Sequence, residues 1–349
     1  MASWRSNLTV AVVSALTIVG ADVALQQVMP VPPALLEVED GVAALESGDP
    51  EILLIGSSHA RSFVPIRDRL AAASGGRRQM ALVSLEFGKL TGYAWVLDHR
   101  LRPLVEETRA DGTLVRPSLR RLILVTEWWD GCATGHGLAL NIPARAFTLW
   151  HLVADVAQNG LNGWNKNWAA WRWGRLWRSS VLVQDRGVHR LRHALRAAVF
   201  GESPEERQAE FDAQVAYWRA MTEEGATDPL CRDPGEQAAL EHIVDWGLGR
   251  GLDVTLLLFP RMPVTLTKKA KATTIAIWRA RVETLARDRG VRLVDMSTSS
   301  PLTDADFMSD FDHVTAEGNE KLADWALEGD LHFLLDAPGP PPVAARGDR

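Results

Sequence analysis

Ile52-Leu53-Leu54-Ile55-Gly56-Ser57-Ser58-His59 is the stretch on which our interpretation of the fold rests. Its first four residues form an unbroken apolar, β-rich run, which is typical of a strand buried on both faces of a parallel sheet. Gly56 ends the run, and we expect the serines to lie in a tight turn into a helix. A serine there exposes its hydroxyl and leaves its backbone N–H free to stabilise an oxyanion. Alone the motif is weak, because serines after strands are common turn residues.

Apolar runs of the same kind recur along the chain and alternate with helical patterns. Further strands are predicted at residues 80–85, 122–126, 254–259 and 291–294. Helices are predicted at residues 93–107, 236–248, 271–289 and 315–327. This alternation predicts an α/β domain over residues 45–330, in which a central parallel sheet has helices on both faces, as a three-layer sandwich.

A long insertion, residues 130–235, interrupts this domain and is expected to be mostly helical. It holds half of the chain's 14 tryptophans, which outnumber the 9 phenylalanines and 2 tyrosines. Tryptophan is enriched where one edge of a side chain is apolar and the other is wet. Trp164, Trp168 and Trp171 share one face of a predicted helix. That face either binds a membrane surface or a partner, or packs the insertion onto the core.

The two ends of the chain differ from the predicted domain. Residues 1–28 contain an apolar run, residues 8–19, behind Arg5, which is typical of a signal peptide or an N-terminal membrane anchor. Small residues at 19–21 would suit cleavage, whereas a run continuing past Asp22 would approach the length of a membrane span. We therefore expect an extracytoplasmic protein, in the periplasm or at the cell surface, anchored by its N-terminus. The Pro- and Gly-rich tail, residues 337–349, is predicted to be disordered.

Composition narrows the class of protein further. Of 349 residues, 46% are hydrophobic and 23% charged, as expected of a globular chain with a sizeable core. A net charge of -6 argues against nucleic acid as a partner. Cys132 and Cys231 match no zinc or redox spacing, and are either bridged to each other or two separate thiols. No metal or organic cofactor is implied.

A second motif with chemical meaning lies near the C-terminus, where Asp310-Phe311-Asp312-His313 precedes the predicted helix 315–327. An imidazole here can lie over a serine on a neighbouring strand, while a carboxylate three residues earlier fixes its tautomer. Asp and His at this spacing are alternatively metal ligands, but no other His or Cys cluster nearby would complete such a site. The combination of Ser58 after the first strand with Asp310 and His313 before the last helix indicates a catalytic serine far more specifically than either motif does alone.

Together the two motifs resemble those of the SGNH/GDSL hydrolase superfamily, over roughly residues 50–126 and 252–328. Gly56-Ser57-Ser58 stands where the first block of that family has Gly-Asp-Ser, and Asp310-x-x-His313 matches the last block. The resemblance implies Ser58 as nucleophile, His313 as general base and Asp310 as its orienting acid. It also implies an oxyanion hole formed by the backbone N–H groups of Ser58 and Gly88, the match to the second-block glycine.

The third block departs from the family pattern. Gly-x-Asn-Asp is expected after the third strand, but the chain has Glu127-Trp128-Trp129, so the Trp128 indole N–H becomes a candidate oxyanion donor. The Gly-Ser-Ser start and this Trp-bearing block resemble the membrane-anchored branch of the D-alanyl transfer protein and the polysaccharide O-acetylation proteins. Such proteins commonly work with a membrane-bound O-acyltransferase. An ordinary α/β-hydrolase is a poorer match, because Ala60 replaces the second glycine of its G-x-S-x-G elbow.

Three further side chains are predicted at the sheet edge where open α/β sheets bind ligands. His59 is expected either to bind substrate and tune Ser58, or simply to cap or pack its helix. Glu127 is a second candidate substrate-binding residue. Arg261, after the fourth strand, is expected to be a solvated turn residue rather than part of the site.

The sequence therefore predicts an exported serine esterase or O-acyltransferase that acts on acyl esters of cell-envelope glycans through an acyl-Ser58 intermediate. Its expected partners are an acylated glycan or another acyl ester, the membrane surface and a membrane-bound O-acyltransferase. The alternative is a non-catalytic envelope protein of the same fold that binds glycan or such an acyltransferase. The intact Ser, Asp and His set favours catalysis, whereas the missing asparagine favours the alternative.

Overall fold

The structure, a computed structural model, describes residues 33–76, 78–85, 88–131, 234–267, 269–308 and 312–336, together with Val13 and Thr17. The chain divides into two compact units, and the strands that the structure describes all belong to the unit formed by Ala34–Ala139 and Gln208–Arg349. Most of the predicted segment 1–28, nearly all of the insertion 130–235, both cysteines and the tail 337–349 lie outside the described residues. Within the described ranges, no helix combines the length and the apolar character needed to cross a membrane.

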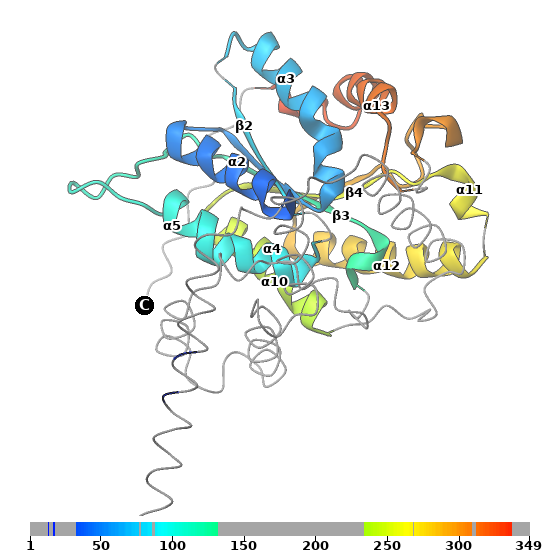
Figure 1. Cartoon of the computed structure of the whole chain (residues 1–349), viewed down its shortest axis with the longest axis horizontal. Helices are drawn as coiled ribbons and strands as arrows, with labels where there is room; N and C mark the ends of the chain where they lie inside the picture. Colours follow the sequence, from blue (N-terminus) through cyan, green and yellow to red (C-terminus); the bar gives the residue numbers. More distant parts are fainter. Residues whose placement is uncertain are drawn as a thin grey trace, which may run out of the picture. The chain divides into compact units, whose positions relative to one another are not determined.

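A five-stranded parallel sheet forms the centre of the described unit (Figure 1). Its strands lie in the order β2-β1-β3-β4-β5, and every neighbouring pair is parallel. Each strand agrees with its predicted position to within one residue at either end. The bounds are β1 Ile52–Gly56, β2 Met80–Ser84, β3 Arg121–Thr126, β4 Asp253–Leu258 and β5 Arg292–Asp295.

Helices cover both faces of this sheet, which confirms the predicted three-layer α/β sandwich. In Figure 1, α3 and α13 lie on one side of the strands, and α4, α10 and α12 lie on the other. The strand residues alternate accordingly: Ile123 and Val125 pack into a core with α3 and α13, whereas Leu122 lies against α10 at Gly247. The α-helices are α2 Pro33–Ser47, α3 Val64–Ala73, α4 Leu90–Val96, α5 Arg102–Val105, α10 Pro234–Gly249, α11 Pro263–Leu266, α12 Lys269–Arg289 and α13 Ala316–Glu328.

Short 3₁₀ segments follow several strands and complete the fold: η1 Ser58–Phe63, η3 Trp128–Gly131, η5 Asp304–Asp306 and η6 His332–Leu334. The predicted helix 93–107 is less regular than expected, because it divides into α4, a π-helical turn η2 at Leu97–Leu101, and α5. Pro103 explains the break: proline lacks the N–H that an α-helix needs, and its ring clashes with the preceding turn. Helix α2 has no counterpart among the predicted helices.

Two buried contacts pack helices closely around the sheet. In α2, Gly41 approaches β2 so closely that a Cβ there would lie 2.6 Å from the carbonyl oxygen of Leu82. At the start of α10, the buried Glu236 carboxylate accepts hydrogen bonds from the Thr91 N–H (2.8 Å) and hydroxyl (2.9 Å). Glu236 thus caps the positive N-terminus of α4 and ties two helices of the same layer together.

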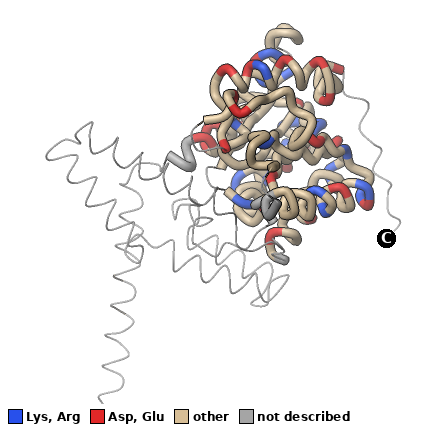
Figure 2. The backbone as a smooth tube through the Cα atoms, turned by 90° about the vertical axis from the view of Figure 1, so that its right-hand side faces the viewer, with Lys and Arg blue, Asp and Glu red and all other residues tan. Residues whose placement is uncertain are grey.

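Charged side chains of both signs are interspersed along the described backbone (Figure 2). Many of them form exposed ion pairs, such as Arg289 with Asp245 at 2.7 Å and Arg69 with Glu320 at 2.6 Å. Solvent screens such pairs, so each contributes roughly 0–1 kcal/mol. The charges that matter for the site are buried ones, at the carboxyl edge of the sheet.

Candidate active site

Four segments of the chain meet where the carboxyl ends of the parallel strands lie side by side, the edge at which open α/β sheets bind ligands. They are the β1–η1 turn at Ser57–His59, Glu127 after β3, Arg261 after β4, and Asp312-His313 before α13. Of these residues, Ser58, His59, Glu127 and His313 were expected at this edge as parts of a site. The parallel topology thus brings together residues from distant parts of the chain.

The turn after β1 presents Ser58 at the start of a helix. Gly56 is required there, because a Cβ would lie 2.9 Å from the Cβ of Val125 and 3.3 Å from that of Ala60. Ser57 caps η1, its hydroxyl oxygen accepting the His59 N–H at 3.2 Å. Ser58 is the first residue of η1, so its own N–H has no acceptor within the helix. This N–H is therefore available to an incoming oxyanion.

Ser58 and His313 lie in hydrogen-bond contact although 255 residues separate them: the Ser58 Oγ is 2.7 Å from the His313 Nε2. The loop that carries His313 is held by its own backbone, because the His313 carbonyl accepts the Met308 N–H at 2.7 Å. A bridge between Phe307 and Val314 narrows the same loop. At this distance the imidazole can accept the serine proton as the hydroxyl attacks an electrophile.

Asp310, the predicted orienting acid, lies outside the described residues, as does Phe311. Its role stays a prediction. The neighbouring acid, Asp312, has a different function in the structure, since its carboxylate binds His59 and Arg261.

Asp312 belongs to a set of four charges that we call the charge clamp: His59, Glu127 and Arg261 are buried, whereas the Asp312 side chain is 28% exposed. His59 Nδ1 lies 2.7 Å from Glu127 Oε1, and His59 Nε2 lies 3.3 Å from Asp312 Oδ2. Arg261 closes the ring by donating to Glu127 Oε2 and to Asp312 Oδ1, both at 2.7 Å. The Ser57 hydroxyl also donates to Glu127, at 2.8 Å. Two cations therefore alternate with two carboxylates.

Burial and mutual attraction compete within the charge clamp, and attraction dominates. Burial opposes a charge on His59, but the carboxylates of Glu127 and Asp312 raise its pKa to about 10. Burial likewise opposes ionisation of Glu127, but His59 and Arg261 lower its pKa to about 2. Against the same effect of burial, His59 and Arg261 hold the pKa of Asp312 below its usual range. At neutral pH His59 is therefore an imidazolium that donates from both ring nitrogens.

A further carboxyl group, that of Asp130, lies beneath the charge clamp and behaves oppositely. Asp130 is completely buried, and its Oδ2 accepts the Glu127 N–H at 2.8 Å. Burial and the negative charge of Glu127 raise the Asp130 pKa well above its usual range. The neutral acid is thus favoured at Asp130, and the ionised carboxylate at Glu127.

The expected oxyanion donors are only partly placed for that role. The Gly88 N–H already donates to the Leu85 carbonyl at 2.7 Å, and the Tyr93 hydroxyl donates to the Gly88 carbonyl at 3.1 Å. The Gly88 N–H would have to leave the Leu85 carbonyl before it could bind an oxyanion, and its role as an oxyanion donor stays a prediction. The ring of Trp128 lies against Arg261, whose guanidinium carbon is 5.9 Å from the ring centroid.

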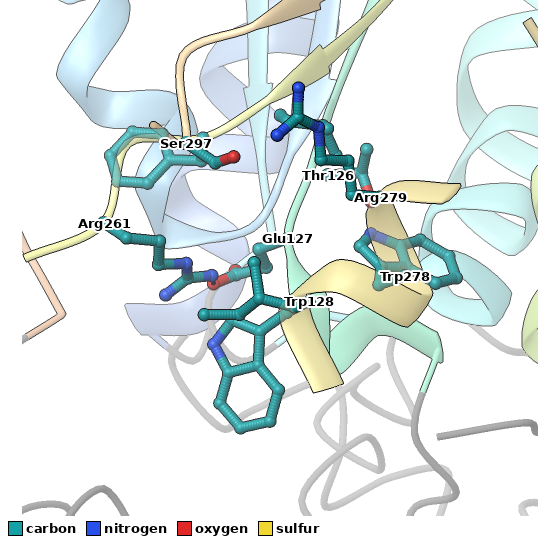
Figure 3. Close-up of a pocket in the computed structure, with 10 residues that line it drawn as sticks. Thr126, Glu127, Trp128, Arg261, Trp278, Arg279 and Ser297 are labelled. Atoms are coloured by element: carbon teal, nitrogen blue, oxygen red, sulfur yellow. Dashed lines mark hydrogen bonds and ion pairs between the residues drawn. The ribbon is translucent and has the colours of Figure 1, made fainter. Parts of the chain in front are cut away.

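Figure 3 shows a pocket at this edge, with the Arg261 guanidinium pointing toward the Glu127 carboxylate and Trp128 beside them. Trp278, from α12, lines the pocket and is buried, and its indole N–H has no hydrogen-bond partner among the described residues. The pocket therefore combines aromatic surface with polar groups. Its lining consists of Thr126, Glu127, Trp128, Leu258, Phe259, Arg261, Ile275, Trp278, Arg279 and Ser297.

His59, Asp312 and His313 are also close enough together to be considered as metal ligands, since one ligand atom from each lies within 4.8 Å of the others. The donor set fits poorly, however. Both nitrogens of the His59 imidazolium carry protons, and an oxygen of Asp312 is paired with Arg261. A cation would have to displace a proton and an arginine, so these residues fit an ion-pair network better than a metal centre.

Two expectations about individual residues change. Glu127 was expected to contact substrate, and His59 either to contact substrate or to cap or pack its helix; only 3% and 1% of their surfaces are exposed, and they bind each other. Arg261 was expected in solvent, but it is buried, at 6% exposure. The pairing of Glu127 with Arg261 could have been suspected from the sequence, because these residues of opposite charge each come after a strand, and the two strands are neighbours in the sheet.

Comparison with known proteins gives little beyond this geometry. No family model matches the chain, and no curated protein does. One similar solved structure is a provisionally assigned acylhydrolase from Bacteroides fragilis, with a TM-score of 0.40 and 11% identity, over 86% of this chain and 97% of that one. Similarity at this level establishes neither a shared fold nor a shared activity, so the conclusions about function rest on the site.

Proposed function

We propose that this chain is a serine esterase or O-acyltransferase of the SGNH type, with Ser58 as nucleophile and His313 as general base. The observation that carries the proposal is the 2.7 Å contact between Ser58 Oγ and His313 Nε2. Ser58 is also the first residue of a helix at the carboxyl edge of a parallel sheet, where ligands bind. The resemblance of the two motifs to the SGNH blocks points to the same pair.

In this mechanism Ser58 Oγ attacks the carbonyl carbon of an acyl ester while His313 Nε2 takes the hydroxyl proton. The resulting oxyanion is stabilised by the Ser58 N–H, and by Gly88 once its turn opens or by the Trp128 indole. The tetrahedral intermediate collapses as His313 returns the proton to the leaving alkoxide, leaving an acyl group on Ser58. Water or an acceptor hydroxyl, deprotonated by His313, then releases the acyl group by the reverse steps.

The substrate class is an acyl ester of a cell-envelope glycan, and the protein works outside the cytoplasm. The apolar segment within residues 1–28 supports export or anchoring, and the Gly-Ser-Ser and Glu-Trp-Trp motifs resemble the branch that acts on envelope polymers. A membrane-bound O-acyltransferase is the expected partner. Hydrolysis and transfer use the same residues and differ in whether water or a hydroxyl acceptor reaches acyl-Ser58.

A fluorophosphonate probe tests the proposal without knowledge of the natural substrate. The full chain should form one adduct, located on Ser58 by peptide mass spectrometry, and Ser58→Ala should form none. Ser62→Ala is the matched control, because Ser62 is a buried serine of the same helix η1, and it should label like the wild type. A wild-type protein that is folded and forms no adduct on Ser58 at any pH from about 5 to about 9 contradicts the proposal.

The second candidate is a non-catalytic envelope protein that binds glycan or a membrane acyltransferase. Two observations favour it: the chain has Glu127-Trp128 where an oxyanion-binding asparagine is expected, and the Gly88 N–H is bonded within its own turn. The probe experiment separates the two, since a non-catalytic protein would bind an acetylated glycan but form no adduct on Ser58. Loss of acyl groups from that glycan only in the presence of wild-type protein supports the enzyme instead.

A further inference from the structure

We infer that His59 and Arg261 are positioning residues, which hold Asp312, and through it the adjacent His313, in line with Ser58. The inference rests on the proposed function, because it concerns the same Ser58–His313 pair. It adds that the third-block position of this chain is used for alignment: Glu127 anchors both cations of the charge clamp.

His59 links the segment of the nucleophile to the segment of the base. It follows Ser58 directly in η1, and its Nε2 lies 3.2 Å from the Asp312 carbonyl oxygen and 3.3 Å from Oδ2. Its ring also stacks on that of His313, with the centroids 4.9 Å apart and the planes 18° from parallel. One rigid side chain therefore contacts both the backbone next to His313 and the face of its imidazole.

Arg261 holds Asp312 from the other side. Its planar guanidinium binds two carboxylates at once, Asp312 through Nη1 and Glu127 through Nη2, each at 2.7 Å. Such a fork fixes direction as well as distance, which a single ammonium group does not. Since His59 binds Oδ2 of Asp312 and Arg261 binds Oδ1, both carboxylate oxygens are held.

The anchor of this arrangement belongs to the sheet itself. Glu127 follows β3, and its carboxylate accepts from Ser57, His59 and Arg261. Its backbone N–H donates to Asp130, which is completely buried. Because His59, Glu127 and Arg261 are buried, these three side chains have little access to water as an alternative partner, and their arrangement is stiff. Asp312 is 28% exposed, but two of the three buried side chains hold it. The raised pKa of His59, about 10, agrees with a ring that donates from both nitrogens throughout the physiological range.

Misalignment should slow the chemical step more than it weakens substrate binding. His59 is almost fully buried, and the Arg261 guanidinium, although it lines the pocket, is bound to Glu127 and Asp312. Displacing a catalytic group by about 1 Å lowers rates by about 100-fold. We therefore expect His59→Gln and Arg261→Gln to lower kcat for p-nitrophenyl acetate, and the rate of fluorophosphonate labelling at Ser58, by about 10- to 100-fold. KM should stay within about twofold.

Two further variants complete the experiment. Arg261→Lys keeps the charge and loses the fork, so its kcat should lie between those of wild type and Arg261→Gln. His242→Gln is the matched control: its ring nitrogen pairs with Asp98 at 2.9 Å in another part of the fold, and we expect rates within about twofold of wild type. All variants are assayed as full chains whose folding is checked by circular dichroism.

Several outcomes would overturn the inference while leaving the proposed function intact. These are folded His59→Gln and Arg261→Gln proteins that label Ser58 as fast as wild type, or variants in which KM rises and kcat does not change. If wild type itself does not label at Ser58, the proposed function fails first, and the positioning role fails with it.

A spectroscopic measurement requires no variant to fold. In wild type labelled with ¹⁵N-histidine, one ring should keep both nitrogens protonated from about pH 6 to about pH 9, since Glu127 and Asp312 hold both protons on His59. A spectrum in which every histidine loses a ring proton below about pH 8 overturns the charge clamp, whatever the activity.

Discussion

The chain contains two pairs of a histidine with a carboxylate, and they lie in very different environments. At the sheet edge, His59 Nδ1 lies 2.7 Å from the Glu127 carboxylate, and their side chains are 1% and 2% exposed. Between α10 and the turn η2, His242 Nε2 lies 2.9 Å from the Asp98 carboxylate, and those side chains are 25% and 20% exposed. The distances are nearly equal, so the difference between the two pairs is one of environment.

Environment determines what each pair can do. Water reaches His242 and Asp98, screens their attraction, and offers either partner an alternative when the other is lost. His59 and Glu127 have no such alternative, because removing one member of a buried ion pair leaves an uncompensated charge. The buried pair is in addition part of a closed set with Arg261 and Asp312. The same chemistry therefore gives a stiff positioning element in one region and a weak surface contact in the other.

The largest effect is expected from removing the shared anion of the charge clamp. Glu127→Gln leaves the two cations His59 and Arg261 with Asp312 alone, and should lower the free energy of unfolding by about 3–5 kcal/mol. Urea denaturation at neutral pH measures this change. The comparison fails if Asp98→Asn, the equivalent change in the partly exposed pair, costs as much; we expect at most about 1 kcal/mol there.

A smaller loss is expected from changing the geometry of the cation while keeping its charge. In Arg261→Lys a single ammonium replaces a fork that joins two carboxylates, so a charge-assisted hydrogen bond is lost. The free energy of unfolding should fall by about 1.5–3 kcal/mol, as measured by the same denaturation. Arg289→Lys, in an exposed pair with Asp245, should change it by less than about 1 kcal/mol. Equal losses in both variants would show that burial is not the deciding factor.

Stability should also depend on pH through the buried histidine. The pKa of His59 is about 10 in the folded protein and near 6.5 in the unfolded chain, so between these values only the folded state holds the proton. Its contribution is complete below pH 6.5 and is lost as the pH rises toward 10, with a slope of at most about 1.4 kcal/mol per pH unit. Glu127 acts oppositely: its pKa is lowered from 4.5 to about 2, so its contribution is lost as the pH falls through that range.

Variants separate this dependence from the titration of the other histidines. Denaturation midpoints recorded between about pH 6 and about pH 10 should fall less steeply in His59→Gln than in wild type. A His59→Gln protein with an unchanged slope would mean that His59 is not held as a cation.

The smallest effect concerns the exposed pair itself. His242→Gln removes one partner of a solvent-screened contact, so the free energy of unfolding should change by about 0–1 kcal/mol, with less change at high salt. Thermal and urea denaturation at low and high ionic strength test this. A loss comparable to that of Glu127→Gln would remove the distinction between the two regions.

Much of the fold could be predicted because its signals are local. Each strand is a short apolar run bounded by turn residues, and all five strands lie within one residue of their predicted ends. Ser58 and His313 were predicted from motifs, and the structure places them 2.7 Å apart. The single helix predicted at 93–107 is too regular, because Pro103 interrupts the α-helical hydrogen bonds of the preceding turn.

The charge clamp was beyond such reasoning, because its members lie far apart in the chain. Arg261 is 134 residues from Glu127, and Glu127 is 68 residues from His59. An arginine after a strand is ordinarily solvated, and nothing adjacent to Arg261 in the sequence reveals that two carboxylates surround it. The hydrogen bond from the Gly88 N–H to the Leu85 carbonyl could not be predicted either, because no sequence motif specifies it.

What can be derived from the sequence alone is therefore the order of strands and helices and the presence of a serine and a histidine at one sheet edge, since hydrophobic periodicity and turn residues act over a few positions. The tertiary structure determines which of the side chains at this edge are charged and which partners each charge binds. Whether His59 is neutral or an imidazolium, and whether Arg261 is a surface cation or a buried fork, depends on local burial and on neighbouring charges. Those neighbours come from other strands, and only folding brings them together.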